Sequence, residues 1–136
     1  MARKKDRTDM PHRSAQERSK DFEEVSLGYS KEMALEEAQR CLQCKTPTCE
    51  QGCPVGIGIK DFIKHMQTED LNKASESLEK SNTLSAVCGR VCPQETQCES
   101  KCILAKKGQP IAIGRLERYL GDYSMKKKQH SKSKLH

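Results

Sequence analysis

Cysteine is the residue type in this chain whose number and spacing could do chemistry. All eight cysteines of the 136 residues lie between positions 41 and 102. The first four have the spacing C-x2-C-x4-C-x3-C and are followed by proline, at Cys41, Cys44, Cys49, Cys53 and Pro54. Bacterial ferredoxins use a similar C-x2-C-x2-C-x3-C-P run to hold iron-sulfur clusters. The other four repeat the C-x3-C-P element, at Cys88, Cys92, Cys98 and Cys102. Two such runs predict two iron-sulfur clusters.

Zinc and disulfide bonds are the alternatives for the same thiols. Structural zinc sites use paired C-x2-4-C knuckles, and only Cys41 and Cys44 form a tight pair of that kind. The chain has no N-terminal signal segment and no apolar run long enough to cross a bilayer, which predicts a cytoplasmic protein. A reducing compartment favours metal ligation over disulfides. A non-redox interaction module, with zinc or a purely structural cluster, is the alternative function.

The composition predicts a small domain that needs metal support. The chain is 32% charged, 34% hydrophobic and 4% aromatic, and it contains no tryptophan, so its apolar core must be thin. Its length corresponds to one domain. Small domains with thin cores are usually stabilised by metals or disulfides.

The net charge of +6 is distributed unevenly along the chain. Residues 1–20 and 121–136 each carry a net charge of +4, and the residues between them carry −2. Basic ends without interleaved aromatic residues are typical of solvated tails, so nucleic-acid binding is not predicted. We therefore expect a flexible basic arm over residues 1–28, an iron-sulfur domain over 29–123 and a disordered basic tail over 124–136.

The elements that must position the cysteines are predicted to be helices. Ser30 is expected to cap a helix over residues 31–41, which delivers Cys41 from its last turn. Apolar residues at i, i+3, i+4 and i+7 predict a second helix, with Ile59, Phe62, Ile63 and Met66 facing a core. Asp70 is expected to cap a third helix. No stretch alternates with period two, so the predicted fold class is all-α.

The later half of the chain continues this pattern. Asn82 is predicted to cap a fourth helix that ends at Cys92-Pro93, with its inward face formed by Leu84, Val87, Cys88 and Val91. Residues 95–102 are expected to form a short helical turn with Cys98 and Cys102 on one side. A last helix is expected to begin near Ile111 and run through Leu120, with Glu117 at its inward edge.

Four segments together resemble a known family. They are Glu37-Ala-Gln-Arg-Cys-Leu-Gln-Cys44, Cys53-Pro-Val-Gly, Cys88-Gly-Arg-Val-Cys-Pro93 and Ile113-Gly-Arg-Leu-Glu-Arg118. Over residues 31–123 the chain resembles the N-terminal iron-sulfur domain of the glutamate synthase small (beta) subunit, which is also found in dihydropyrimidine dehydrogenase and in NADH-dependent ferredoxin:NADP oxidoreductases. The resemblance implies an α-helical ferredoxin with two 4Fe-4S clusters that passes electrons between a flavin and a second redox partner.

The resemblance also implies which residues bind each cluster. The first cluster would be held by Cys41, Cys44, Cys49 and Cys102. The second would be held by Cys53, Cys92, Cys98 and a non-cysteine ligand at Glu117. On the residues alone, a glutamate between Arg115 and Arg118 is ordinarily part of a surface ion pair, and Cys88 is the rival fourth ligand for an all-cysteine second cluster.

One departure from the resemblance limits what this chain can do alone. The small subunit continues into FAD and NADPH domains, each opened by a glycine-rich loop, whereas this sequence contains no G-x-G-x-x-G. We therefore expect an electron-transfer subunit or domain of an oxidoreductase, with FAD and NADPH on a partner or on a missing domain. No catalytic residues are predicted. The expected partners are a flavoprotein and a glutamate synthase-type large subunit or another redox protein, with no membrane association.

Overall fold

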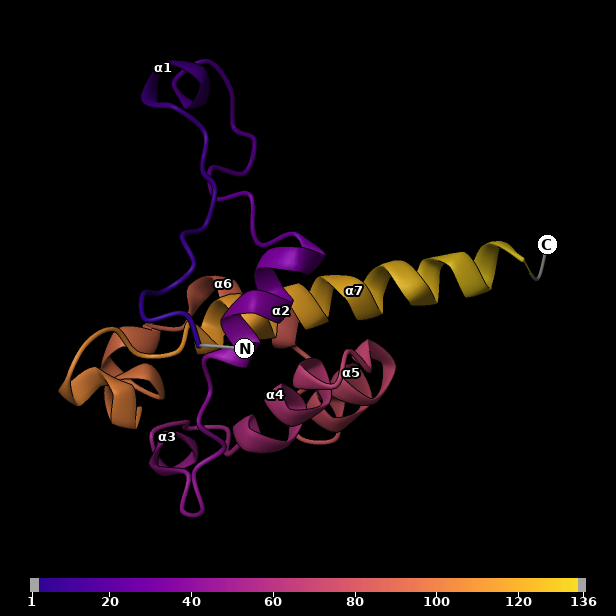
Figure 1. The fold of residues 1–136 in the computed structure, drawn as a ribbon. Coiled ribbons are helices and arrows are strands. Elements are labelled where there is room, and N and C mark those ends of the chain that lie inside the picture. The colour runs from indigo at the N-terminus through magenta and orange to yellow at the C-terminus, as the bar shows by residue number, and fades with distance from the viewer. Residues whose placement is uncertain (1–2, 135–136) are drawn as a thin grey trace.

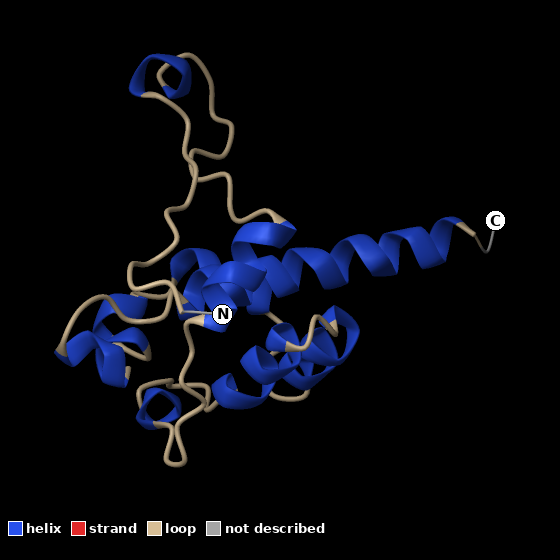
Figure 2. Cartoon of the chain, viewed as in Figure 1, coloured by secondary structure: helices blue, strands red, loops and turns tan. Residues whose placement is uncertain are grey.

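The computed structural model describes residues 3–134, and within them it contains helices and loops but no strand (Figures 1 and 2). One isolated antiparallel bridge joins His12 to Ser26. The α-helices are α1 (Ala15–Arg18), α2 (Lys31–Gln39), α3 (Thr48–Gln51), α4 (Ile59–Gln67), α5 (Leu71–Glu79), α6 (Ser85–Val91) and α7 (Ile113–Ser133). Three 3-10 turns are η1 (Gln94–Thr96), η2 (Glu99–Lys101) and η3 (Ile103–Lys106). The prediction of an all-α fold is confirmed.

An apolar core lies where α2, α4, α5 and α7 meet. The predicted stripe of α4 is buried as expected, at Ile59, Phe62, Ile63 and Met66. Asp70 caps α5 as predicted, because its Oδ1 accepts from the Lys73 amide at 3.0 Å. None of the helices in residues 3–134 combines the length and the apolar character needed to cross a lipid bilayer.

Helix α6 packs against α7 through small residues. A Cβ atom on Gly89 would lie 2.5 Å from the backbone nitrogen of Arg118, and one on Gly121 would overlap the backbone nitrogen of Ala86. Only glycine at these two positions allows the helices to approach so closely. Helix α6 carries Cys88, and helix α7 carries Glu117.

The close packing makes the predicted inward face of the fourth helix wrong. Leu84, Val87 and Val91 are 63%, 52% and 70% exposed, because the glycine-containing face and not the apolar one contacts α7. The predicted cap is also displaced. Helix α6 begins at Ser85 with Leu84 at its N-cap, and Asn82 instead accepts from the Leu84 amide two residues further on.

The last helix is longer than predicted. α7 continues to Ser133 and extends beyond the other helices, whereas residues 124–136 were expected to be disordered (Figure 1). Polar contacts with α5 hold this extension: Ser124 donates to Glu79, Lys128 pairs with Glu79 at 3.0 Å, and Lys127 donates to Asn72 at 2.8 Å. Residues 135 and 136 of the predicted tail lie outside the described residues.

The basic N-terminal arm contacts the helical body at its base and then projects from it as a loop containing α1 (Figure 1). Thr8 is buried, and its amide donates to Glu37 of α2 at 2.8 Å. Further along, Arg90 of α6 contacts Glu24 of the arm at 2.6 Å. The arm therefore spans from α2 to α6. Residues 1 and 2 of the predicted arm lie outside the described residues.

Candidate iron-sulfur sites

Three separate segments bring the first group of thiols together. α2 ends at Gln39, two residues earlier than predicted, and Cys41 follows its C-cap. Cys44 lies in the next loop, and α3 carries Cys49. Cys102 enters from far along the chain, between η2 and η3. Residues about sixty positions apart, Cys41 and Cys102, therefore meet at one site.

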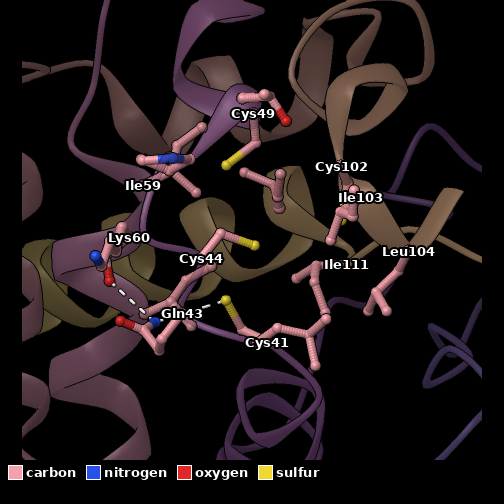
Figure 3. Close-up of a pocket in the computed structure, with 15 residues that line it drawn as sticks. Cys41, Gln43, Cys44, Cys49, Ile59, Lys60, Cys102, Ile103, Leu104 and Ile111 are labelled. Atoms are coloured by element: carbon pink, nitrogen blue, oxygen red, sulfur yellow. Dashed lines mark hydrogen bonds between the residues drawn. The ribbon is translucent and has the colours of Figure 1, made fainter.

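Cys41, Cys44 and Cys49 direct their sulfur atoms toward a cavity of about 30 Å³, which Cys102 also lines (Figure 3). Cys41, Cys44, Cys49 and Cys102 supply its thiols. The other walls are largely apolar and come from α4, η3 and the start of α7, at Ile59, Ile63, Ile103, Leu104, Ile111 and Ile113. Soft thiolate donors in an apolar shell are the surroundings that iron-sulfur clusters require.

The apolar shell changes the acidity of these thiols. Burial, followed by the nearby Cys102 and Cys41, raises the pKa of Cys49 to about 12. Burial also raises the pKa of Cys41, although hydrogen bonds from Gln43 oppose the shift. Thiols of this kind become thiolates when a cation replaces the proton, so metal binding at this group releases protons.

The second group draws its residues from the ends of α3 and α6, the start of η2 and the helix α7. Burial raises the pKa of Cys92, and the adjacent Cys88, Glu117 and Cys53 raise it further. Burial and Glu99 raise the pKa of Cys98 to about 12, and Cys53 and Glu117 contribute as well. Cys53 and Glu117 thus both lie near enough to Cys92 and to Cys98 to raise the pKa values of those two thiols.

Glu117 does not form the surface ion pair that its neighbours in sequence suggest. Its side chain is buried on α7 and accepts a hydrogen bond from Asn82 Nδ2 at 2.8 Å. Burial raises its pKa to about 7, despite that hydrogen bond. Arg118 pairs instead with Glu24 of the arm at 3.2 Å.

Cys98 and Cys102 diverge, although the sequence predicted that both would lie on one side of a helical turn. The segment forms two short 3-10 turns, η1 and η2, and not one α-helical turn. Cys53 and Glu117 contribute to the raised pKa of Cys98, whereas Cys102 lines the cavity of the first group. The loop between them is therefore shared by both thiol groups.

Asn82 and Glu37 are two polar residues near these sites whose roles sequence reasoning missed. Asn82 was interpreted only as a helix cap, yet its amide contacts the buried Glu117. Glu37 accepts from the backbone amide of Ala112, which lies between two isoleucines of the first cavity. In the sequence, each is a polar residue a few positions before a cysteine: Glu37 precedes Cys41, and Asn82 precedes Cys88.

All eight thiols are free in the structure. Among residues 3–134, no three His, Cys, Asp or Glu side chains converge tightly enough to hold a single metal ion. The four thiols of the first group, which include Cys102, surround a space instead. The helical architecture and the four soft donors around one apolar cavity place the chain in the class of iron-sulfur cluster domains.

Comparison with known families agrees with this class. The family described as dihydropyrimidine dehydrogenase domain II, 4Fe-4S cluster, matches residues 18–129. The chain belongs to this family, which confirms the predicted resemblance, and its cofactor is of the 4Fe-4S type.

Three curated relatives illustrate the similarity. The glutamate synthase [NADPH] small chain of Azospirillum brasilense is 38% identical over 111 residues, which cover 81% of this chain and 23% of the relative. The NAD-dependent dihydropyrimidine dehydrogenase subunit PreT of Escherichia coli is 37% identical over 102 residues, covering 75% of this chain and 25% of the relative. The putative oxidoreductase UacF of Escherichia coli is 35% identical over 113 residues, covering 82% and 18%. The chain thus spans about a quarter or less of the length of each relative.

Proposed function

We propose that this chain is an electron-transfer module that carries two 4Fe-4S clusters. Electrons would pass one at a time between an NAD(P)H-linked flavoprotein and a second redox partner. Iron-sulfur clusters supply reversible one-electron chemistry, tuned by ligands, hydrogen bonds and solvent exposure. The chain's own residues bind the clusters, keep water away from them and set their surroundings.

The observation that carries the proposal is the convergence of four thiols on one apolar cavity. Cys41, Cys44, Cys49 and Cys102 would hold the first cluster, since all four line that cavity. Cys53, Cys92, Cys98 and Glu117 would hold the second, and the effects of Cys53 and Glu117 on the pKa values of Cys92 and Cys98 support their proximity. Cys88, next to Cys92, would remain free.

The names of the relatives support the choice of partners. They include the small chain of an NADPH-dependent glutamate synthase and a subunit of an NAD-dependent dehydrogenase. We propose that FAD and NAD(P)H bind to a partner or to a further domain. A glutamate synthase-type large subunit or another redox protein would be the second partner. A chain with eight free thiols fits a cytoplasmic location, where thiols stay reduced.

Anaerobic purification with iron and sulfide assays tests the proposal. Two 4Fe-4S clusters require about eight iron atoms per chain and a brown absorbance that bleaches on reduction. A colourless protein with about two zinc atoms per chain would instead identify a structural zinc module. About four iron atoms per chain would leave one cluster and overturn the two-cluster relay.

The fourth ligand of the second cluster requires its own test. Glu117→Ala is expected to reduce the iron content or change the electron paramagnetic resonance of one cluster, whereas Cys88→Ala is expected to change neither. The reverse pattern would assign the site to Cys88. Both variants keep Cys41, Cys44, Cys49 and Cys102, so the first cluster serves as the internal reference.

A further inference from the structure

Asn82 makes three hydrogen bonds that fix its position in the loop between α5 and α6. Its backbone amide donates to the carbonyl of Leu78 at 3.0 Å, and its side-chain Oδ1 accepts from the Leu84 amide at 2.9 Å. Its Nδ2 donates to Glu117 Oε1 at 2.8 Å. The residue is buried, so these protein contacts take the place of water.

The Leu84 contact determines which end of the amide faces Glu117. An amide has one acceptor and one donor end, and the Leu84 N–H can only be met by the oxygen. Turning the amide over would set its NH2 group against the Leu84 N–H and its oxygen against the carboxylate. Asn82 is therefore held as a donor to Glu117.

Among the described residues, Asn82 is also the only hydrogen-bond donor to the Glu117 carboxylate. The bond falls on Oε1, and no described residue donates to Oε2. One oxygen of the carboxylate is thus fixed by the protein, and the other is left for a different partner. Metal-binding carboxylates are commonly oriented by a hydrogen bond of this kind.

We infer that Asn82 is a positioning residue that orients Glu117 for the second cluster and raises the reduction potential of that cluster. This inference rests on the proposed function, in which Glu117 is an iron ligand. Reduction adds negative charge to a cluster and its ligands, and a donor on the ligating carboxylate stabilises that charge. Removing the donor therefore favours the oxidised cluster.

The test is a redox titration of each cluster by electron paramagnetic resonance in the anaerobically purified chain. Asn82→Ser keeps a short acceptor for the Leu84 amide but cannot reach Glu117. We expect it to lower the ratio of reduced to oxidised second cluster, at a given potential, by at least tenfold. For one electron this corresponds to a reduction potential lower by at least 59 mV. The first cluster should not change.

Two further variants complete the design. Asn82→Asp keeps the size and the acceptor but places a second carboxylate against Glu117, so its shift should exceed that of Asn82→Ser. Asn72→Ser is the matched control, because Asn72 also contacts α7, at Tyr123 and Lys127, but lies outside both thiol groups. It should leave both clusters unchanged.

The outcomes separate the inference from the proposed function. A shift below tenfold in Asn82→Ser, or equal shifts in both clusters, overturns the positioning role. If Glu117→Ala still alters the second cluster in that case, the ligand assignment stands and only the inference fails. If Glu117→Ala keeps full iron and an unchanged spectrum, Glu117 is not a ligand, and the inference falls together with that part of the proposed function.

Discussion

Replacing Glu37 by alanine is expected to lower the free energy of unfolding by about 3–5 kcal/mol, the range for breaking one side of a buried ion pair. Glu37 is fully buried, and its carboxylate pairs with Arg40 at 2.6 Å. It also accepts from the amides of Thr8 at 2.8 Å and Ala112 at 2.9 Å. The substitution would leave the buried Arg40 guanidinium with backbone carbonyl acceptors but no counter-charge, and both amides without their acceptor.

Urea denaturation followed by circular dichroism measures the effect. A domain of this size has a slope of about 1–3 kcal/mol per molar urea, so the midpoint should fall by about 2 M. Glu36→Ala is the matched control from the next position, because that side chain is 50% exposed and its ion pair with Lys4 contributes at most about 1 kcal/mol. Equal midpoints for the two variants would refute the reasoning. Because Ala112 adjoins the first cavity, Glu37→Ala should also bind less iron.

Three further predictions concern packing, charge and iron. Gly121→Ala should lower the free energy of unfolding by about 1–3 kcal/mol, because its added methyl group would push α6 away from α7. In the same urea assay Gly108→Ala should have little effect, because a Cβ atom there would meet only one atom, at 4.0 Å. Hydrogen bonding by Arg13 lowers the pKa of Asp21 from its ordinary value of 3.8 to about 2. The contact therefore stabilises the arm at pH values above 3.8, and this stabilisation is lost as the pH falls toward 2. In Arg13→Gln, carboxyl NMR titration should show the pKa of Asp21 raised toward that ordinary value, while the Glu23 amide still donates to the carboxylate, and an unchanged pKa would contradict the contact. Chelating the iron should increase hydrogen exchange in the cysteine loops more than in α4 and α5, and uniform exchange would contradict this.

Helix periodicity predicted much of the fold, because α4 and α5 bury regular apolar stripes. The same rule failed for α6, where close contact between Gly89 and the backbone of Arg118 determines which face is buried. Hydrophobicity patterns describe how much apolar surface a helix has, but not how near another backbone can come. As a result, Val87 and Val91 are exposed although their spacing predicts burial.

The predicted tail failed for a related reason. A run of lysines without acidic neighbours is typical of disorder when only the local sequence is considered. In the fold, α5 places Asn72 and Glu79 beside the lysines of α7, so contacts between distant segments stabilise the helix. The grouping of Cys102 with Cys41, Cys44 and Cys49 was implied only by the family resemblance. The spacing of the cysteines does not determine which of them share a cluster.

Glu37 and Glu117 show how the structure separates a structural carboxylate from a candidate ligand. Both are buried glutamates on helices that border the cysteines. Glu37 has three donors, and Arg40 neutralises its charge. Glu117 has one neutral donor, Asn82, and forms no ion pair with a described residue. A buried carboxylate whose charge no side chain balances either keeps a proton or binds another cation, and iron at the second thiol group would supply that cation. If this reasoning is correct, Glu37→Gln should weaken folding while sparing the spectrum of the second cluster, and Glu117→Gln should change that spectrum with a smaller loss of stability.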